Sequence, residues 1–237
     1  MRWLLVAALL LGGAGCAPTS MSPMVMRMMP GDALRGPQGS IGIRTGPRLA
    51  TPLAAASSPG PSVPFPGDNN IFSVPQWGFA YDLGTTLPFG ESNFAAHLGV
   101  QGEFYAPLPL PAYGVYAGFS HYFPMGKASI APALSGRFAT DFGIPSTPLS
   151  GTQAGGELSV AIAFHPEEAI AIGIVPFASY DHLWSRDRQA YGLYTGAAVV
   201  VRLRVSGQSY ELSGGFGRVF MPGNAWNVPI LGICAGR

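Results

Sequence analysis

Large apolar residues alternate with small or polar residues along most of the chain between residues 77 and 220, and no other feature constrains the fold as strongly. In residues 94–104 the even positions are apolar or small, whereas His97, Gln101 and Glu103 occupy odd positions. A period of two residues is typical of a β-strand whose two faces differ in chemistry. Repeated in strand after strand, it predicts an all-β fold, an antiparallel up-and-down barrel with one apolar wall.

The composition favours a membrane protein that crosses the bilayer with strands. Hydrophobic residues make up 48% of the chain and charged residues only 11%, against a usual charged share of about 25%. After the N-terminus, no apolar run approaches the roughly 20 residues that a spanning helix needs. In a transmembrane β-barrel only alternate residues face lipid, so high hydrophobicity needs no long runs. The net charge of +1 offers no basic patch for nucleic acid.

We expect eight strands, most of them of about ten residues or more, as a tilted crossing of the bilayer requires. Their ranges are 76–83, 94–105, 112–123, 128–142, 153–164, 169–181, 190–205 and 209–220. Residues 40–45 and 228–234 are two further candidates, and both together would make ten strands.

The small-residue face indicates which side of the barrel is apolar. It consists mainly of Gly, Ala and Ser, and the only lysine of the chain is Lys127. Nine charged residues share this face: Asp82, Glu103, Arg137, Asp141, Glu157, Asp181, Arg202, Arg204 and Glu211. Small residues and paired charges suit the interior of a narrow barrel, so the apolar face is expected to contact lipid. Arg218 alone is out of phase, near a strand end from which it can reach the membrane interface. A periplasmic lipocalin-like barrel that binds a ligand on an inward apolar face is the rival fold.

The N-terminus predicts export. Residues 1–15 have the pattern of a signal peptide, a positive residue followed by a short apolar stretch and small residues. Residues 13–16 resemble a bacterial lipobox, which implies lipidation of Cys16 and sorting to the outer membrane, because Ala17 follows the cysteine. Gly13 departs from that pattern, so an ordinary signal peptide is the alternative. Cys234 would then be the only cysteine left for other chemistry, and we interpret it as an inert thiol.

Four parts follow from these features: the signal peptide, a flexible linker over residues 16–70, a barrel over residues 71–220 and a tail over residues 221–237. The linker is rich in Pro, Ser and Gly and contains too little apolar surface to offset its ordering entropy. Its methionines crowd together at Met21, Met24, Met26, Met28 and Met29. Thioethers can bind Cu(I), but no histidine joins them, and a membrane-proximal tether is the favoured interpretation.

The pattern of residues 72–220 resembles the small outer-membrane barrels of the OmpA and OmpX type, in architecture and without a shared motif. Residues 210–220 look like the aromatic-ended last strand that the assembly machinery reads in that family. There the strand usually closes the chain, whereas here residues 221–237 follow it. The family places short turns on the periplasmic side, and with eight strands the N-terminal linker would then arrive from outside the cell.

The charges of the barrel interior are the best-defined candidate site. The predicted lumen charge network contains Glu103, Glu157, Glu211, Arg137, Arg202, Arg204 and Asp141. Buried charges must be paired, because an unpaired one costs several kcal/mol. We favour a plug that fills the barrel over a gate or a narrow ion path.

An enzyme needs a nucleophile and a base, and His121 on the predicted lipid face is the residue to consider. Some outer-membrane barrels are lipid-modifying enzymes with His and Ser near the lipid, and the deacylase pattern places the Ser two residues after its His. That position here is Phe123, and Ser120 points to the opposite face. Neither a metal-ligand spacing nor a phosphate-binding loop is present, so we predict no catalytic residue, metal site or cofactor.

The most polar connection, residues 182–189, is the candidate contact with a partner, because Trp and Arg anchor interfaces. Its contact residues would be Trp184, Arg186, Asp187 and Arg188. The sequence as a whole predicts a lipid-anchored outer-membrane barrel, non-enzymatic, that serves as a structural element of the envelope or as a subunit of an envelope-spanning assembly. Its partners would be outer-membrane lipid and other envelope proteins, with the oligomeric state left open. The alternative functions are a small-solute channel and a lipid-modifying enzyme.

Overall fold

A computed structural model describes residues 38–47, 77–90, 93–105, 112–140, 151–185, 188–221 and 224–236. Eleven strand segments account for nearly all of these residues. They are β1 (Gln38–Pro47), β2 (Trp77–Pro88), β3 (Phe94–Tyr105), β4 (Ala112–His121), β5 (Phe123–Met125), β6 (Ala128–Thr140), β7 (Gly151–Glu167), β8 (Ile170–Ser185), β9 (Arg188–Val205), β10 (Gln208–Met221) and β11 (Asn224–Gly236). Over these ranges, no helix is long and apolar enough to cross a membrane.

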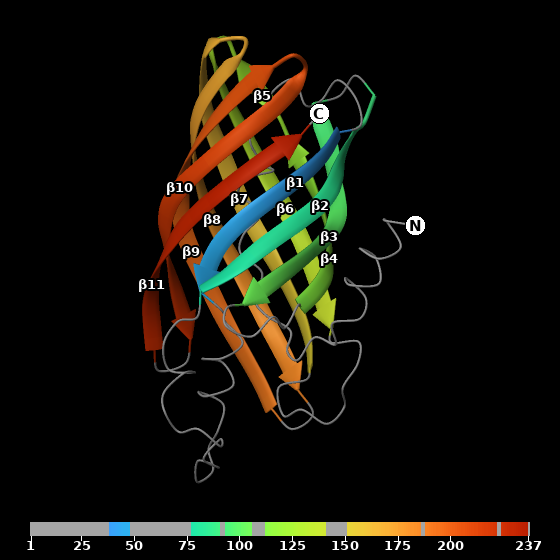
Figure 1. Ribbon diagram of the computed structural model, residues 1–237, viewed down its shortest axis with the longest axis vertical. Helices are drawn as coiled ribbons and strands as arrows, with labels where there is room; N and C mark the ends of the chain where they lie inside the picture. The colour runs from blue at the N-terminus through green and yellow to red at the C-terminus, as the bar shows by residue number, and fades with distance from the viewer. Residues whose placement is uncertain are drawn as a thin grey trace.

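The strands form one antiparallel sheet whose two ends meet (Figure 1). Strands that follow one another along the chain are hydrogen-bonded neighbours, β4 pairs with β6, and β1 pairs with β11. The three-residue β5 follows β4 after Tyr122 and pairs with β6. In the described part of the chain the ring therefore contains ten long strands, which confirms the all-β antiparallel barrel.

The expected count of eight strands is wrong, and the alternative of ten strands is confirmed. The two additional strands are β1 and β11, which lie in the ranges that we assigned to the linker and to the C-terminal tail. In this ring β2 and β10 do not pair with each other, because β1 and β11 lie between them and pair with them.

The two faces of the sheet differ as the alternation predicts. Apolar side chains that point outward are exposed, as in Leu134 at 61% and Phe216 at 74%, whereas Ala161 and Val200, which point inward, are at 0%. Further exposed apolar residues on several strands include Leu98, Val115, Leu158, Ile174, Val199, Leu212 and Ile233. We call this outward face, which the sequence predicts to contact lipid, the lipid-facing wall. The lipocalin-like alternative is wrong, because its apolar side chains would have to point inward.

Every connection at one end of the barrel, at the top of Figure 1, has at most five residues, and we call it the turn end. The longest connections, 48–76 and 141–150, belong to the opposite end, which also has the two-residue connections 186–187 and 222–223. Ser206 and Gly207 join β9 to β10 with φ angles of 51° and 79°, the two positive values of a type I′ hairpin turn. The register of β1 with β11 and β2 places both Gln38 and Gly236 at this same end. With ten strands, the segment before β1 therefore enters on the side of the short turns. The opposite end is called the loop end below.

Candidate functional site

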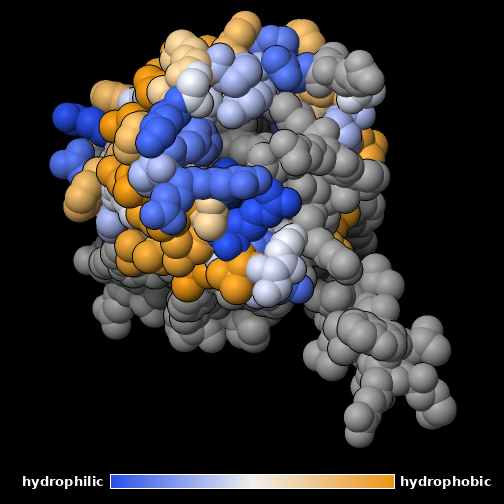
Figure 2. Space-filling view, turned by 90° about the horizontal axis from the view of Figure 1, so that it is seen from above, coloured by the Kyte–Doolittle hydropathy of each residue, from blue (hydrophilic) through white to orange (hydrophobic). Residues whose placement is uncertain are grey.

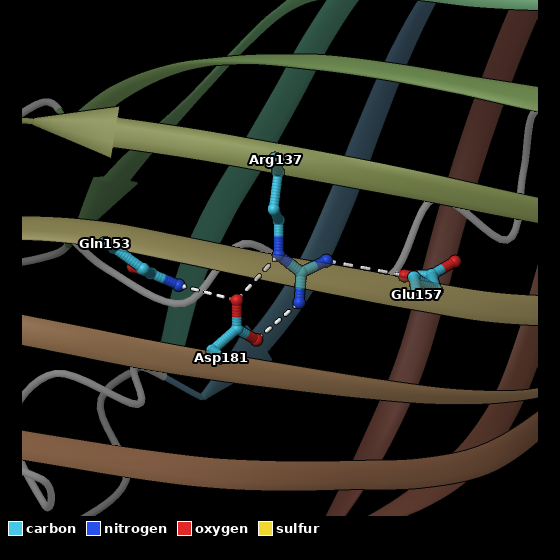
Figure 3. A network of polar contacts seen from close by, with 4 residues as sticks. All are labelled: Arg137, Gln153, Glu157 and Asp181. Atoms are coloured by element: carbon cyan, nitrogen blue, oxygen red, sulfur yellow. Dashed lines mark hydrogen bonds and ion pairs between the residues drawn. The ribbon is translucent and has the colours of Figure 1, made fainter.

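Arg137, Asp181, Glu157 and Gln153 form a buried polar cluster inside the barrel, the Arg137 cluster (Figure 3). Nε of Arg137 donates to Oδ1 of Asp181 at 2.8 Å, and Nη2 of Arg137 pairs with Oδ2 of Asp181, so the contact is bidentate. Nη1 lies 3.4 Å from Oε2 of Glu157, and Nε2 of Gln153 donates to Oδ1 of Asp181 at 3.0 Å. The side chains of Arg137, Glu157 and Asp181 are 4%, 0% and 1% exposed. One guanidinium thus neutralises carboxylates that are shielded from water.

Gly155 allows Arg137 and Asp181 to meet, although β7 lies between their strands. The register places Arg137 opposite Gly155, and Gly155 opposite Asp181. Because neighbouring strands are about 4.8 Å apart, the backbones of β6 and β8 are separated by about 10 Å, within reach of an arginine side chain. A Cβ atom on Gly155 would collide with the Asp181 carboxylate and lie 2.7 Å from the carbonyl oxygen of Tyr180. The ion pair therefore depends on a glycine at position 155.

Aromatic side chains fill the interior beside the Arg137 cluster. Phe177 and Tyr194 are each 5% exposed, and their rings pack edge to face with centroids 5.0 Å apart. A Cβ on Gly196 would lie 2.8 Å from the Phe177 ring, and one on Gly217 would collide with the ring of Tyr194. Large inward side chains are thus seated against glycines, which is how a small barrel packs its interior.

The structure divides the predicted charge network into two groups. Arg137 and Glu157 belong to the Arg137 cluster in the loop-end half of the barrel. Arg202 and Glu211 lie opposite each other in the register of β9 and β10, close to the turn end, and are 6% and 9% exposed. Viewed from the turn end, hydrophilic residues gather in the middle of the barrel with hydrophobic residues around them (Figure 2).

The remaining members of the predicted network are Arg204, Glu103 and Asp141. Arg204 lies two residues beyond Arg202, and its backbone N–H donates to the carbonyl oxygen of Ala169 at 2.8 Å. The side chain of Glu103 and the whole of Asp141 lie outside the described residues. Asp181, which the pattern placed on the inward face but which we left out of the network, is the main partner of Arg137.

Hydrogen bonds between histidine and hydroxyl groups lie inside the barrel near the turn end, and sequence reasoning missed them. Nε2 of His97 is 2.6 Å from Oγ of Ser120, and its Nδ1 is 3.0 Å from Oγ1 of Thr86. Nε2 of His165 is 2.9 Å from Oγ of Ser129. The period of two places His97 on the inward face, but the partner of each imidazole depends on the register between strands.

His121 lies in an aromatic group at the turn end. Its ring centroid is 4.1 Å from that of Phe94 and 4.2 Å from that of Phe123. The neighbouring Ser120 is directed to His97 inside the barrel instead. This environment agrees with a place in the aromatic girdle at the membrane interface.

The predicted partner-contact loop is shorter than expected, because β8 continues to Ser185 and β9 begins at Arg188. Trp184 and Arg188 therefore belong to strands, and their side chains, like Arg186 and Asp187, lie outside the described part. The contact with a partner stays a prediction.

The cysteines and methionines give no further site in the described part of the chain. Cys16 and the five clustered methionines of the linker lie outside it, and the thiol of Cys234 is buried and not part of a disulfide. Among the residues that the structure describes, no group of three or more His, Cys, Asp or Glu is arranged to hold a metal ion.

No protein-family model and no curated protein matches this chain. Among solved structures, the chain is similar to the Yersinia pestis outer membrane protein Ail in a phospholipid bilayer nanodisc. The sequence identity is 12%, and the match covers 84% of this chain and 99% of that chain with a TM-score of 0.29. A likeness at that TM-score carries no argument for function, which rests instead on the two faces of the barrel and the contacts in its interior.

Proposed function

We propose that this chain is an outer-membrane β-barrel lipoprotein, anchored at Cys16, that acts as a non-enzymatic structural element of the envelope or as a subunit of an envelope-spanning assembly. The observation that carries the proposal is the contrast between the two faces. Outward apolar side chains such as Phe216 at 74% exposure surround an interior of buried small and polar residues. A wall of this kind is stable only where lipid covers it.

The arrangement of the barrel ends supports the outer membrane and the anchor. In bacterial outer-membrane barrels the short turns face the periplasm, and here Gln38 and Gly236 lie at the turn end. Residues 17–37 would span at most about 70 Å if fully extended. An acylated Cys16 can therefore insert in the periplasmic leaflet beside the barrel.

The filled interior supports a structural role over transport. Inward side chains at several heights are inaccessible to water, including Ala95, Ser129, Ala161 and Val175 at 0%. A continuous aqueous pore would leave such side chains exposed. The Arg137 cluster lies in the loop-end half of the interior, and the Phe177–Tyr194 pair also points inward, with large side chains packed against glycines.

The first test is membrane fractionation of the native protein and of the Cys16→Ala variant, with carbonate washing and with gel mobility before and after boiling. We expect both proteins to require detergent for extraction and to shift in mobility on boiling, because the barrel itself is integral. Metabolic labelling with palmitate should mark only the protein that retains Cys16. Release of the Cys16→Ala variant by carbonate would contradict a lipid-facing wall, and absence of label would contradict the anchor alone.

A small-solute channel is the second candidate, because some inward polar atoms have no hydrogen-bond partner in the described part of the chain. Both amide atoms of Gln101, Oγ of Ser159 and Oγ of Ser179 are buried in this way. Such atoms are those that ordered water satisfies, so water within the lumen would favour conduction. Planar-bilayer recordings distinguish the two functions: a structural barrel gives no unitary current, whereas a channel gives one that changes in Gln101→Leu.

A further inference from the structure

We propose that the lipid-facing wall carries a binding site for the phosphate group of an anionic lipid, built from Arg218 on β10, Asn227 on β11 and Thr195 on β9. This inference rests on the membrane location proposed above. It assigns a ligand to the one charged side chain that the alternation placed out of phase.

Arg218 is exposed and shares the outward phase of β10 with Leu212, Phe216 and Phe220. Among the described side chains of the strands, the only other exposed charge is Glu167, the last residue of β7. A cation in contact with lipid is unfavourable unless it reaches the interface or meets an anion. Arg218 therefore needs either water or a negatively charged group beside it.

The depth of Arg218 places its guanidinium near the headgroups. The residue lies three positions before the end of β10. At about 3.3 Å per residue and a tilt of about 40°, its Cα is about 8 Å below the loop end of that strand. Its Cζ lies 5.4 Å from the ring centroid of Phe220, two residues nearer the loop end, so the side chain extends in that direction. This is the orientation of an arginine that snorkels to the interface.

Aromatic residues mark the interface at the same level. The exposed rings of Tyr180 and Tyr191 stack with centroids 6.4 Å apart. In the register of the sheet, Leu193 lies opposite both Tyr180 and Phe220, so these aromatics form a continuous group on β8, β9 and β10. Tyr side chains gather where hydrocarbon meets headgroups.

The neighbours of Arg218 supply further hydrogen-bond donors. Thr195 and Asn227 lie opposite it on the two adjacent strands, and both are at least partly exposed on the outer face. Directly opposed residues of an antiparallel pair have Cβ atoms about 5 Å apart. The three residues therefore lie side by side at the level of their Cβ atoms, and from there the guanidinium extends toward the loop end, beyond the amide and the hydroxyl. The contact recorded for Arg218 is with an aromatic ring, and among the described residues no carboxylate pairs with it.

The chemistry of this group fits a phosphate. A guanidinium binds phosphate oxygens through two parallel N–H···O contacts, and Asn and Thr donate to the remaining oxygens. Anionic headgroups carry phosphates at the depth that Arg218 reaches. The apolar residues around it exclude a hydrated protein partner but suit the acyl chains of the same lipid.

The test compares wild type with Arg218→Gln in a neutral detergent, using native mass spectrometry and added phosphatidylglycerol. Lys127→Gln is the matched control, since it removes the same charge from the exposed turn between β5 and β6, at the opposite end of the barrel. We expect Arg218→Gln to bind phosphatidylglycerol roughly tenfold more weakly, because a charged hydrogen-bonding partner is lost. Lys127→Gln should bind like wild type, and Asn227→Leu should fall between. Uncharged diacylglycerol should bind all of the proteins equally weakly.

The variant is expected to fold, because it removes a charge from the lipid-facing wall. A folded Arg218→Gln barrel that binds phosphatidylglycerol as wild type does would overturn the site and leave the proposed function intact. Inorganic phosphate that binds wild type as well as phosphatidylglycerol does, and is lost in Arg218→Gln, would overturn the lipid as its source. Failure of the wild type to require detergent for extraction would instead overturn the membrane function itself.

Discussion

Replacing Arg137 with methionine removes the one cation of the Arg137 cluster while keeping a long unbranched side chain. The variant loses the bidentate contact with Asp181 and the 3.4 Å contact with Glu157, and it leaves carboxylates that are at most 1% exposed. Breaking a buried ion pair by removing one partner costs about 3–5 kcal/mol. Gln153 continues to donate to Asp181 at 3.0 Å, so we expect a loss of about 3 kcal/mol, the lower end of that range.

The assay is urea unfolding of the barrel in lipid vesicles, followed by tryptophan fluorescence and by the mobility of unboiled protein on gels. Lys127→Met is the control, because the same type of change at an exposed turn alters stability by about 0.5 kcal/mol or less. The triple variant Arg137→Met, Glu157→Gln, Asp181→Asn should recover most of the loss, since neutral groups tolerate burial better than unpaired carboxylates. A single variant within about 1 kcal/mol of wild type, or a triple variant no more stable than the single one, would refute the reasoning.

Three further outcomes follow from the packing. Gly155→Ala should lower the unfolding free energy by about 1–3 kcal/mol, because the added Cβ displaces Asp181. Gly156→Ala is the control and should be tolerated, because the atom nearest to its added Cβ is 3.5 Å away. Equal urea midpoints for the two variants would contradict the role of Gly155. Leu134→Arg, in the middle of β6 on the lipid-facing wall, should lower the unfolding free energy in the same vesicles by about 2–4 kcal/mol. A decrease below about 1 kcal/mol would indicate that water covers that face. Cys234 is 5% exposed, so it should resist maleimide in the folded barrel and react with it after boiling. Mass spectrometry measures the extent of labelling. Rapid labelling of Cys234 in unboiled protein would show that water reaches the interior.

The period of two residues was sufficient to predict which face each side chain occupies. Leu134 and Phe216 lie on the exposed wall and Ser159 in the interior, as the alternation indicates. This information is local, because neighbouring residues of a strand point to opposite faces whatever the strand pairs with. Arg218 stands out for the same reason: one residue out of phase is visible without knowledge of the fold.

The contacts between strands could not be predicted in this way. The pair Arg137–Asp181 depends on the register of β6, β7 and β8 and on the glycine that lies between the two side chains. Period two shows that both residues point inward but does not show that they lie at the same height. The pairing of β1 with β11 could not be predicted either. Each of these strands has only a short apolar run, and neither run shows which two strands meet where the ring closes.

The presence of ten strands, where we expected eight, also explains why the interior holds large side chains. A barrel widens as strands are added, so alanine and serine alone would leave voids in a ring of ten, and each void forfeits packing energy. The chain places Tyr116, Arg137, Phe177 and Tyr194 inward, all at most 7% exposed. Tyr194 packs against a glycine of β10, and Arg137 reaches its partner across a glycine of β7. The abundance of glycine in these strands is therefore a consequence of filling a wide barrel, and a plug is what that arrangement builds.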